Sequence, residues 1–261
     1  MPSTKKNPLP LIRKTISTGI DFFTLVALGD IHYGQEACDV EAVEETVDYL
    51  ASKDPKNYGI VLTGDLIENV IIGSKGSPFE MTEPDPDKQV DRVSEILAPL
   101  KKHILMMCDG NHEDRTKKNT GISPSKCIAR NLGCNYVGYH GILELTLQHK
   151  SHKETYDIYV EHGCGSVPKN ISSRIAKMES IQKQIDADVY VKGHVHHKNA
   201  VAKEVWKKRN GVMVKRKVMF TSNGSYLMDP EYAIRSGFEP TTPGVAKVQL
   251  GTQSFNIHCN I

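Results

Sequence analysis

Short apolar runs alternate with segments of helical periodicity in the first half of the chain. Residues 21–28, 58–63 and 103–107 are nearly continuous apolar stretches, which predict buried strands. Between them, apolar residues recur at helical spacing over 40–50 and 90–100, which predicts two amphipathic helices. Strands that alternate with helices in this way indicate parallel βα units.

The pattern changes in the second half. Residues 142–147 and 155–160 alternate apolar and polar positions around a polar turn, which predicts an antiparallel hairpin. A helix that begins near Ile171 and a strand over 188–191 follow. Further antiparallel strands are predicted over 199–222 and 244–258.

Parallel units followed by hairpins predict an α/β fold in which two mixed sheets pack face to face with helices outside. No tract resembles an interdomain linker, so we expect residues 19–261 to form a single domain. Residues 1–18 are expected to be an N-terminal tail that could be flexible. Residues 72–88, rich in Gly, Pro, Ser and acids, predict a long loop that either is a solvated connection or borders the substrate opening.

Composition narrows the class of protein. The chain is 39% hydrophobic and 25% charged, and no apolar run approaches the length that a membrane span requires. The net charge of +2 is too small to indicate nucleic-acid binding by itself. Six scattered cysteines form no Cys-x-x-Cys pair, and the N-terminal residues contain no apolar signal-peptide core. We therefore expect a cytoplasmic protein with reduced cysteines and no membrane partner.

Polar clusters follow the predicted strands, where α/β proteins carry their chemistry. Each cluster alone would be an ordinary turn or a surface pair. Together they supply two Asp, one Asn and five His, the inventory of a site for two metal ions and a phosphate ester. The clusters are Asp30 with His32, Asp65, Asn111 to Glu113, His162, and His194 with His196.

This inventory suits phosphate-ester hydrolysis, which needs an activated attacking oxygen and relief of negative charge. Asp65 has two oxygens on one carbon and is the natural bridge between two ions. The other ligands divide into Asp30, His32 and His196 for one ion, and Asn111, His162 and His194 for the other. Mixed nitrogen and oxygen ligands favour Mn, with Fe, Zn, Ni or Co as alternatives, over Ca. His112 is expected to stabilise the transition state or to protonate the leaving oxygen.

In their order along the chain, these five clusters resemble the motifs of the calcineurin-like metallophosphoesterase superfamily. The resemblance implies a four-layer αββα sandwich, the ligand division above, in-line attack by a metal-bridging hydroxide, and His112 as the catalytic histidine. Asp65 is followed by Leu66 and Ile67 and not by the Arg-Gly of the Ser/Thr protein phosphatases, so that branch is disfavoured. The segment from Gly224 to Gly244 looks similar to uncharacterised phage and bacterial members.

The leading hypothesis is a dimetal phosphodiesterase that acts on nucleotides or nucleic acid. A DNA exonuclease or endonuclease of the repair type and a non-catalytic scaffold of the same fold are the alternatives; the scaffold is disfavoured because His112 and the seven ligands are present. Candidate substrate contacts are Asn69, Glu113, Lys169 and Arg174, although the last two could simply belong to a solvated helix face. The sequence indicates neither the substrate nor the oligomeric state.

Overall fold

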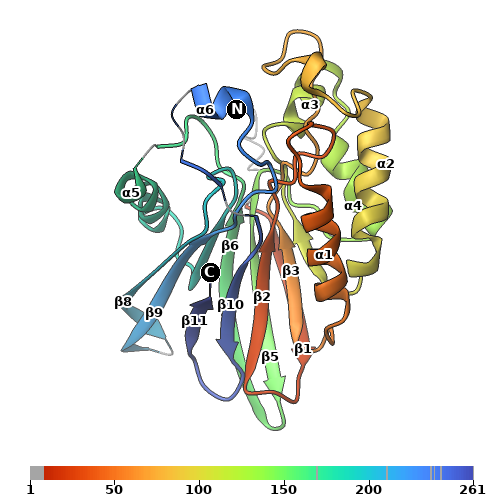
Figure 1. Ribbon diagram of the computed structural model, residues 1–261. Coiled ribbons are helices and arrows are strands. Elements are labelled where there is room, and N and C mark those ends of the chain that lie inside the picture. Colours follow the sequence, from red (N-terminus) through yellow and green to blue (C-terminus); the bar gives the residue numbers. More distant parts are fainter. Residues whose placement is uncertain are drawn as a thin grey trace, which may run out of the picture.

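The computed structural model describes residues 9–168, 170–209, 211–235, 237, 239–241 and 243–260. In that part of the chain the strands form two mixed sheets, one in the order β1-β5-β6-β7-β9-β8 and the other in the order β11-β10-β2-β3-β4 (Figure 1). The first sheet comprises β1 (Leu11–Ser17), β5 (His140–His149), β6 (His152–Glu161), β7 (Val189–Lys192), β8 (Asn199–Arg209) and β9 (Val212–Ser222). The second comprises β2 (Phe22–Leu28), β3 (Tyr58–Leu62), β4 (Ile104–Met107), β10 (Ala246–Gly251) and β11 (Ile257–Asn260).

The two sheets pack face to face over an apolar core. Alternate side chains of β2 and β10, such as Leu25 and Val248, meet side chains of the other sheet, such as Leu145 and Ile158. All four of these residues are at most 1% exposed. Because successive side chains in a strand point to opposite faces, the other half of each strand is left to pack against helices.

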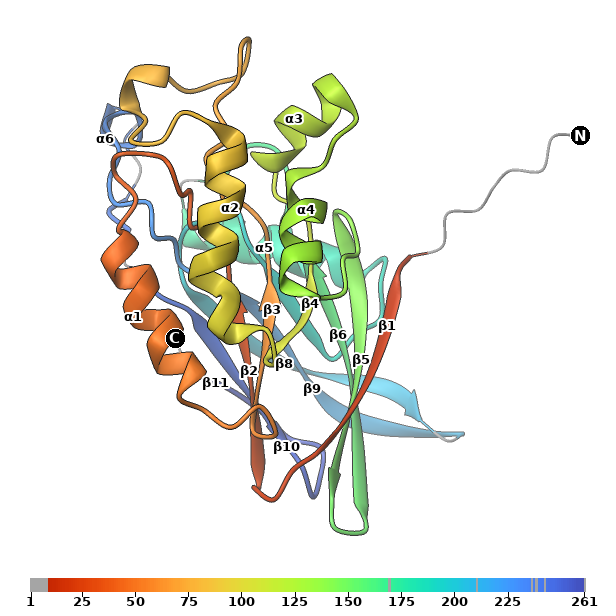
Figure 2. The ribbon, with the colours of Figure 1, turned by 90° about the vertical axis from the view of Figure 1, so that its right-hand side faces the viewer.

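Helices cover both outer faces, which completes four layers (Figures 1 and 2). On the five-stranded sheet, α1, α2 and α4 bury their apolar faces against β2, β3 and β4. On the six-stranded sheet, Met178 of α5 packs with Tyr159, Tyr190 and Phe220. The predicted αββα sandwich is confirmed. These helices are α1 (Val40–Ala51), α2 (Pro86–Leu97), α4 (Pro124–Leu132) and α5 (Ile171–Gln182).

Three short helical segments lie outside the predicted pattern: α3 (Glu113–Thr120), α6 (Glu231–Arg235) and η1 (Pro78–Glu80). A fourth, η2 (Ala98–Leu100), forms the end of the helix predicted over 90–100. The helix α3 carries almost no apolar side chains, so hydrophobic periodicity could not reveal it. The predicted loop at 72–88 contains η1, but its last three residues, 86–88, form the start of α2. Its apolar side chains Ile72 and Phe79 are fully solvent-exposed.

The predicted N-terminal tail is wrong for residues 11–17. They form β1, which pairs in parallel with β5 from Leu11 opposite Ile142 to Ser17 opposite Gln148. Ile12 and Ile16 pack against the core between the sheets, while Arg13 and Thr15 are exposed and Lys14 is partly buried. The charged residues between the apolar ones suit an edge strand, because they discourage pairing with another chain. Residues 1–8 lie outside the described residues.

The parallel strands bring their carboxyl ends to one edge of the sandwich. In the five-stranded sheet β2, β3 and β4 are mutually parallel, and in the six-stranded sheet β6, β7 and β9 are mutually parallel. The loops that leave these six strands carry the polar clusters. No helix within the described ranges is long and apolar enough to cross a membrane.

Candidate metal centre

The backbone of the loops at this edge has an unusual conformation. Eight non-glycine residues in the described chain have positive φ, a conformation that side chains with a Cβ atom rarely adopt. Six of them belong to the polar clusters or adjoin them, and strain of this kind gathers at functional sites. They are Asp30, His32, Asp65, Asn69, His194 and His196, with φ between 49° and 67°.

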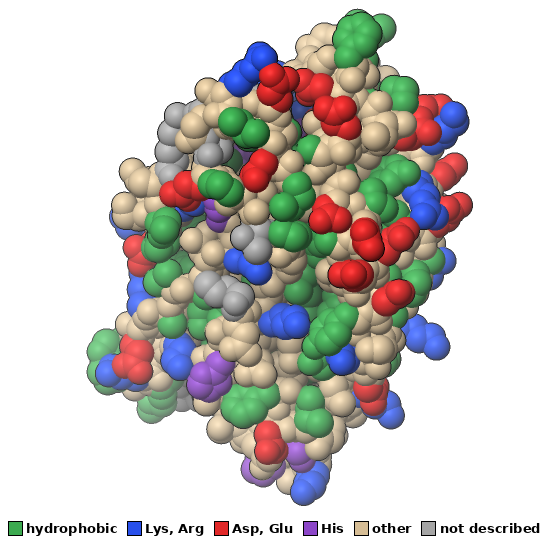
Figure 3. Space-filling view, viewed as in Figure 1, with side chains coloured by type: hydrophobic (Ala, Val, Ile, Leu, Met, Phe, Trp, Pro, Cys, Tyr) green, Lys and Arg blue, Asp and Glu red, His purple; other side chains and the backbone are tan. Residues whose placement is uncertain are grey.

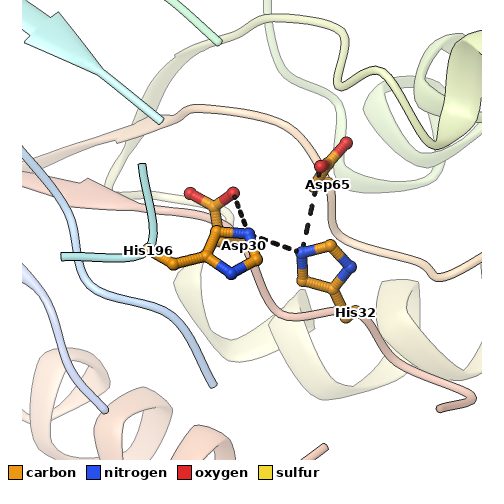
Figure 4. A group of neighbouring side chains, drawn as sticks. All are labelled: Asp30, His32, Asp65 and His196. Carbon is orange, nitrogen blue, oxygen red and sulfur yellow. Dashed lines mark hydrogen bonds and ion pairs between the residues drawn. The ribbon is translucent and has the colours of Figure 1, made fainter. Parts of the chain in front are cut away.

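A first group of side chains gathers Asp30, His32, Asp65 and His196 (Figure 4). Each offers one ligand atom, and these atoms lie within 4.8 Å of one another. The Nε2 atoms of His32 and His196 are 3.1 Å apart, and His196 Nε2 lies 3.4 Å from Asp30 Oδ1. The first predicted ligand set is therefore brought together, on loops that follow β2, β3 and β7.

A second group lies on the other side of Asp65 and contains His162 and His194. The Nε2 atom of His162 is 3.1 Å from Asp65 Oδ2 and 2.9 Å from Asn111 Oδ1. The Nε2 atom of His194 lies 2.7 Å from the carbonyl oxygen of Gly165, which fixes its ring. All seven predicted ligands thus lie in two adjoining groups that share Asp65.

The Oδ2 atom of Asp65 is the strongest sign that these groups fit cations. It is buried and has no hydrogen-bond partner, whereas Oδ1 accepts a bond from the His112 backbone N–H. Burial alone would raise the pKa of Asp65, but the imidazoles of His162 and His112 outweigh it and hold this pKa well below its ordinary value. A buried, ionised oxygen without a donor is expensive unless a cation supplies the missing partner.

Each group has partners that orient its imidazoles. The Nδ1 atom of His32 lies 2.8 Å from Glu68 Oε2, so its Nε2 is left facing the first group. The Nδ1 atom of His162 lies 2.8 Å from the carbonyl oxygen of Thr63. Such partners set the tautomer of a ligand histidine and increase its basicity. Burial would raise the pKa of Glu68, but hydrogen bonds to the two adjacent histidines hold it far below its ordinary value.

Asn223, at the end of β9, is a further residue that sequence reasoning did not assign to the site. Its Nδ2 donates to Asp30 Oδ2 at 2.7 Å, and its Oδ1 accepts from the Thr63 hydroxyl. Ser225 donates to the carbonyl oxygen of Asp30. These bonds hold the Asp30 carboxylate with Oδ1 toward His196. No local sequence signal could reveal them, because Asn223 and Asp30 are 193 positions apart.

His112 lies beside Asp65 and lines the cavity that adjoins the two groups. Its Nδ1 is 2.9 Å from the carbonyl oxygen of Glu68, and its Nε2 is 3.8 Å from Asp65 Oδ2. Arg115 donates to the same Nε2 at 3.0 Å and to the Glu68 carbonyl oxygen at 2.9 Å. Sequence reasoning did not single out Arg115. The structure thus places a permanent cation beside the predicted catalytic histidine.

The predicted substrate contact at Glu113 does not agree with the structure. This side chain is 1% exposed and its two oxygens accept four backbone N–H groups, from Leu66, Ile67, Asp65 and Gly110 at 2.6–3.2 Å. Gly110 allows this close approach, because a Cβ atom there would lie 2.1 Å from Asp65 Oδ1. Glu113 therefore joins two metal-site loops and is unable to reach a substrate.

Asn69 is also turned inward. It is fully buried, its Nδ2 donates to the backbone oxygen of His112, and its Oδ1 accepts from the Thr116 hydroxyl. Asn69 was predicted to contact the substrate, but its side chain contacts the backbone of His112, the predicted catalytic residue. Asn69 supports the position of His112.

The prediction that Arg174 is either a substrate contact or part of a solvated helix face is wrong. This residue is 2% exposed and its guanidinium donates to the carbonyl oxygen of Pro168 and to Glu239. It is thus neither a solvated surface residue nor a cation available to a polyanion. Lys169, the other predicted contact on this segment, lies outside the described residues.

A cavity of about 410 Å³ adjoins the centre. One end is formed by Asp65, His112, His194 and His196. The remaining described residues of its wall are Val167, Val195, His197, Leu227, Asp229, Pro230, Ala233, Ile234, Glu239, Pro240 and Thr241. None of the described lining residues comes from the 72–88 loop.

Comparisons with known proteins identify the family of this chain. The model of the calcineurin-like phosphoesterase family matches residues 23–198. A protein of unknown function from Aquifex aeolicus is 14% identical in sequence, with a TM-score of 0.33 and coverage of 66% of this chain and 79% of that one. GAP50, the anchor in the inner membrane complex of Plasmodium, is 12% identical, with a TM-score of 0.43 and coverage of 89% and 82%. No curated protein matches the chain. Because the family model spans most of the chain and all of the clustered ligands, the chain belongs to the calcineurin-like phosphoesterase family.

Proposed function

We propose that this protein hydrolyses phosphate diesters, of nucleotides or nucleic acid, with two divalent metal ions bound by the two groups that share Asp65. Family membership supports phosphoester hydrolysis in general. The observation that carries the assignment of the centre is the buried Asp65 Oδ2, which makes no hydrogen bond of good geometry and lies 3.1 Å from Nε2 of His162 and 3.9 Å from Nε2 of His32, one histidine of each group.

The donor set fits the proposed ions. Imidazole nitrogens with carboxylate and amide oxygens, and no thiolate, suit Mn and similar metals better than Ca. Bound divalent ions would supply Lewis-acid stabilisation of the phosphoryl oxygens and lower the pKa of water. Asp30, His32 and His196 would hold one ion, and Asn111, His162 and His194 the other.

The residues of this chain would perform the remaining steps. Arg115 would hold a phosphoryl oxygen by its fixed charge. His112 would donate a proton from Nε2 to the leaving oxygen, while the Glu68 carbonyl fixes its Nδ1. A change of the Arg115 contact from His112 Nε2 to the substrate would free that nitrogen for the transfer.

Charge in the cavity supports a diester over a monoester. No Lys or Arg occurs among its described lining residues, whereas Asp229 and Glu239 do. A monoester dianion carries one more negative charge than a diester and would gain less in these surroundings. The departure from the Ser/Thr protein phosphatase motif after Asp65 agrees with this preference.

The experiment compares hydrolysis of bis(p-nitrophenyl) phosphate and p-nitrophenyl phosphate with Mn²⁺ by the wild type, by His112→Ala and by His152→Ala. His152 is an exposed histidine of the β5–β6 hairpin and serves as the matched control. We expect the diester to have the higher kcat/KM, and His112→Ala to lower its kcat by roughly 10²–10⁴-fold, the usual contribution of proton transfer.

The wild type and His152→Ala should be indistinguishable. Absence of hydrolysis of both esters by the Mn-loaded wild type would reject the proposed activity. Full activity of His112→Ala would reject the assignment of His112 alone.

A further inference from the structure

The wall of the cavity opposite the metal centre is apolar. Leu227, Pro230, Ala233, Ile234 and Pro240, all from the segment that follows β9, form this side. Ile234 is 66% exposed although it is a large apolar residue. An exposed apolar side chain that lines a concave site is typical of ligand binding.

We propose that this wall binds the organic group of a small phosphate diester, a single apolar or aromatic group of about nucleobase size that carries no further phosphate. The inference rests on the proposed function, because it places the phosphate at the centre. Asp65, His112, His194 and His196 line the same cavity as the apolar wall, so one molecule would contact both.

The size of the cavity supports a small substrate. Its volume of about 410 Å³ lies in the lower part of the range for small-molecule sites, which is roughly 300–1,000 Å³. One ring system and the phosphate would occupy most of this space. A longer chain would have to leave it.

The charges of the lining argue against a polynucleotide. Proteins that hold single strands use positively charged grooves and aromatic side chains on which bases stack. The described lining residues include no Lys or Arg. Two carboxylates are present instead, Asp229, which is exposed, and Glu239, which pairs with Arg174. A second phosphate in the cavity would therefore be repelled at Asp229.

Acidic residues on the outer surface also argue against a polynucleotide. On the face seen in Figure 3, Asp and Glu side chains gather over α1 and α2, which cover the outer face of the five-stranded sheet. Exposed acids of α1 include Glu41, Glu44 and Glu45. These acids would repel a polyanionic strand.

The test uses methyl p-nitrophenyl phosphate and phenyl p-nitrophenyl phosphate with the Mn-loaded full chain. In both reactions water attacks phosphorus, the bond to p-nitrophenolate breaks, and methyl or phenyl phosphate remains. The leaving group is the same and the intrinsic reactivities of the two esters do not depend on the variant, so the change of the kcat/KM ratio between the wild type and the wall variants reports binding of the second group. We expect the phenyl ester to be favoured by roughly tenfold or more, the scale of one or two buried methylene-sized groups.

Two substitutions alter the wall: Ile234→Glu introduces a charge, and Ala233→Trp fills the space. Each should bring the ratio of the two esters close to one. Val212→Glu, at a residue 58% exposed at the start of β9 and outside the cavity lining, is the matched control and should keep the wild-type ratio. Isothermal titration calorimetry of the Mn-loaded protein with diphenyl phosphate and dimethyl phosphate provides a second readout that needs no turnover.

A wild-type ratio near one, or a ratio unchanged in both wall variants, would overturn the inference. Cleavage of an oligothymidylate with a higher kcat/KM than the phenyl diester would overturn it in favour of a polynucleotide. If neither diester is hydrolysed, the proposed function fails. Tighter binding of diphenyl phosphate that Ile234→Glu removes would still support the cavity, and equal binding of both phosphates would reject it.

Discussion

Glu68 offers a sharp test of how the centre is held, because it touches no predicted substrate position and is absent from the predicted ligand set. Its carboxylate lies 2.8 Å from Nδ1 of His32 and 3.2 Å from Nδ1 of His112. When a cation binds Nε2 of His32, the ring gains positive character and this hydrogen bond strengthens. Glu68→Gln keeps the shape and removes the charge.

The magnitude follows from that bond. A hydrogen bond to a charged group contributes about 1.5–3 kcal/mol. Since about 1.4 kcal/mol corresponds to a factor of ten, the Mn²⁺ affinity should fall by roughly 10–100-fold, as is common for partners of ligand histidines. Titration calorimetry on metal-free protein measures this affinity, and circular dichroism checks that the fold is retained.

Glu44→Gln is the matched control. Glu44 pairs with Arg92 at 2.9 Å, but its side chain is 48% exposed, and exposed pairs contribute little. This variant should bind Mn²⁺ like the wild type. In a His32→Ala background the effect of Glu68→Gln should largely disappear, because the two residues act through one bond. Wild-type affinity in Glu68→Gln would refute the reasoning.

Two further predictions concern stability and pH. Glu113→Ala leaves four buried N–H groups without their acceptor, so we expect a loss of about 4 kcal/mol and a Tm lower by roughly 10 °C; an unchanged Tm in thermal unfolding would contradict the role of Glu113. Burial opposes protonation of His162, but Asp65 outweighs it and raises the pKa of His162 from 6.5 to about 9. In the metal-free protein the stability from this pair is fully present below pH 6.5 and is lost as the pH rises through about 9. Mn²⁺ must displace that proton, so its affinity should rise between these pH values; calorimetry in buffers of different ionisation enthalpy should detect proton release, and a flat pH profile would count against it.

Local patterns were sufficient to predict the layers and the residues that gather at one edge of the sandwich. Continuous apolar runs identify buried strands from their own residues alone, and a residue that directly follows such a strand lies at its carboxyl end. The positions of Asp30, Asp65 and His162 in the fold could therefore be predicted from the residues that precede each of them. The edge strand β1 could not be predicted in this way. Its alternating charged residues are also typical of a solvated tail, and only its pairing with β5 identifies it as a strand.

The direction of a polar side chain was decided only by tertiary structure. Glu113 follows the predicted catalytic histidine in sequence, yet the fold of its loop turns its carboxylate beneath the Asp65 loop. Arg174 lies on a basic segment, yet packing buries it beside Glu239. Asn223 reaches Asp30 across 193 positions. A polar residue satisfies its hydrogen bonds with whatever groups the folded chain brings near it, and these partners are distant in sequence. The sequence therefore determined which residues meet at the edge of the sandwich, and the packing of the loops determined which of them face a substrate.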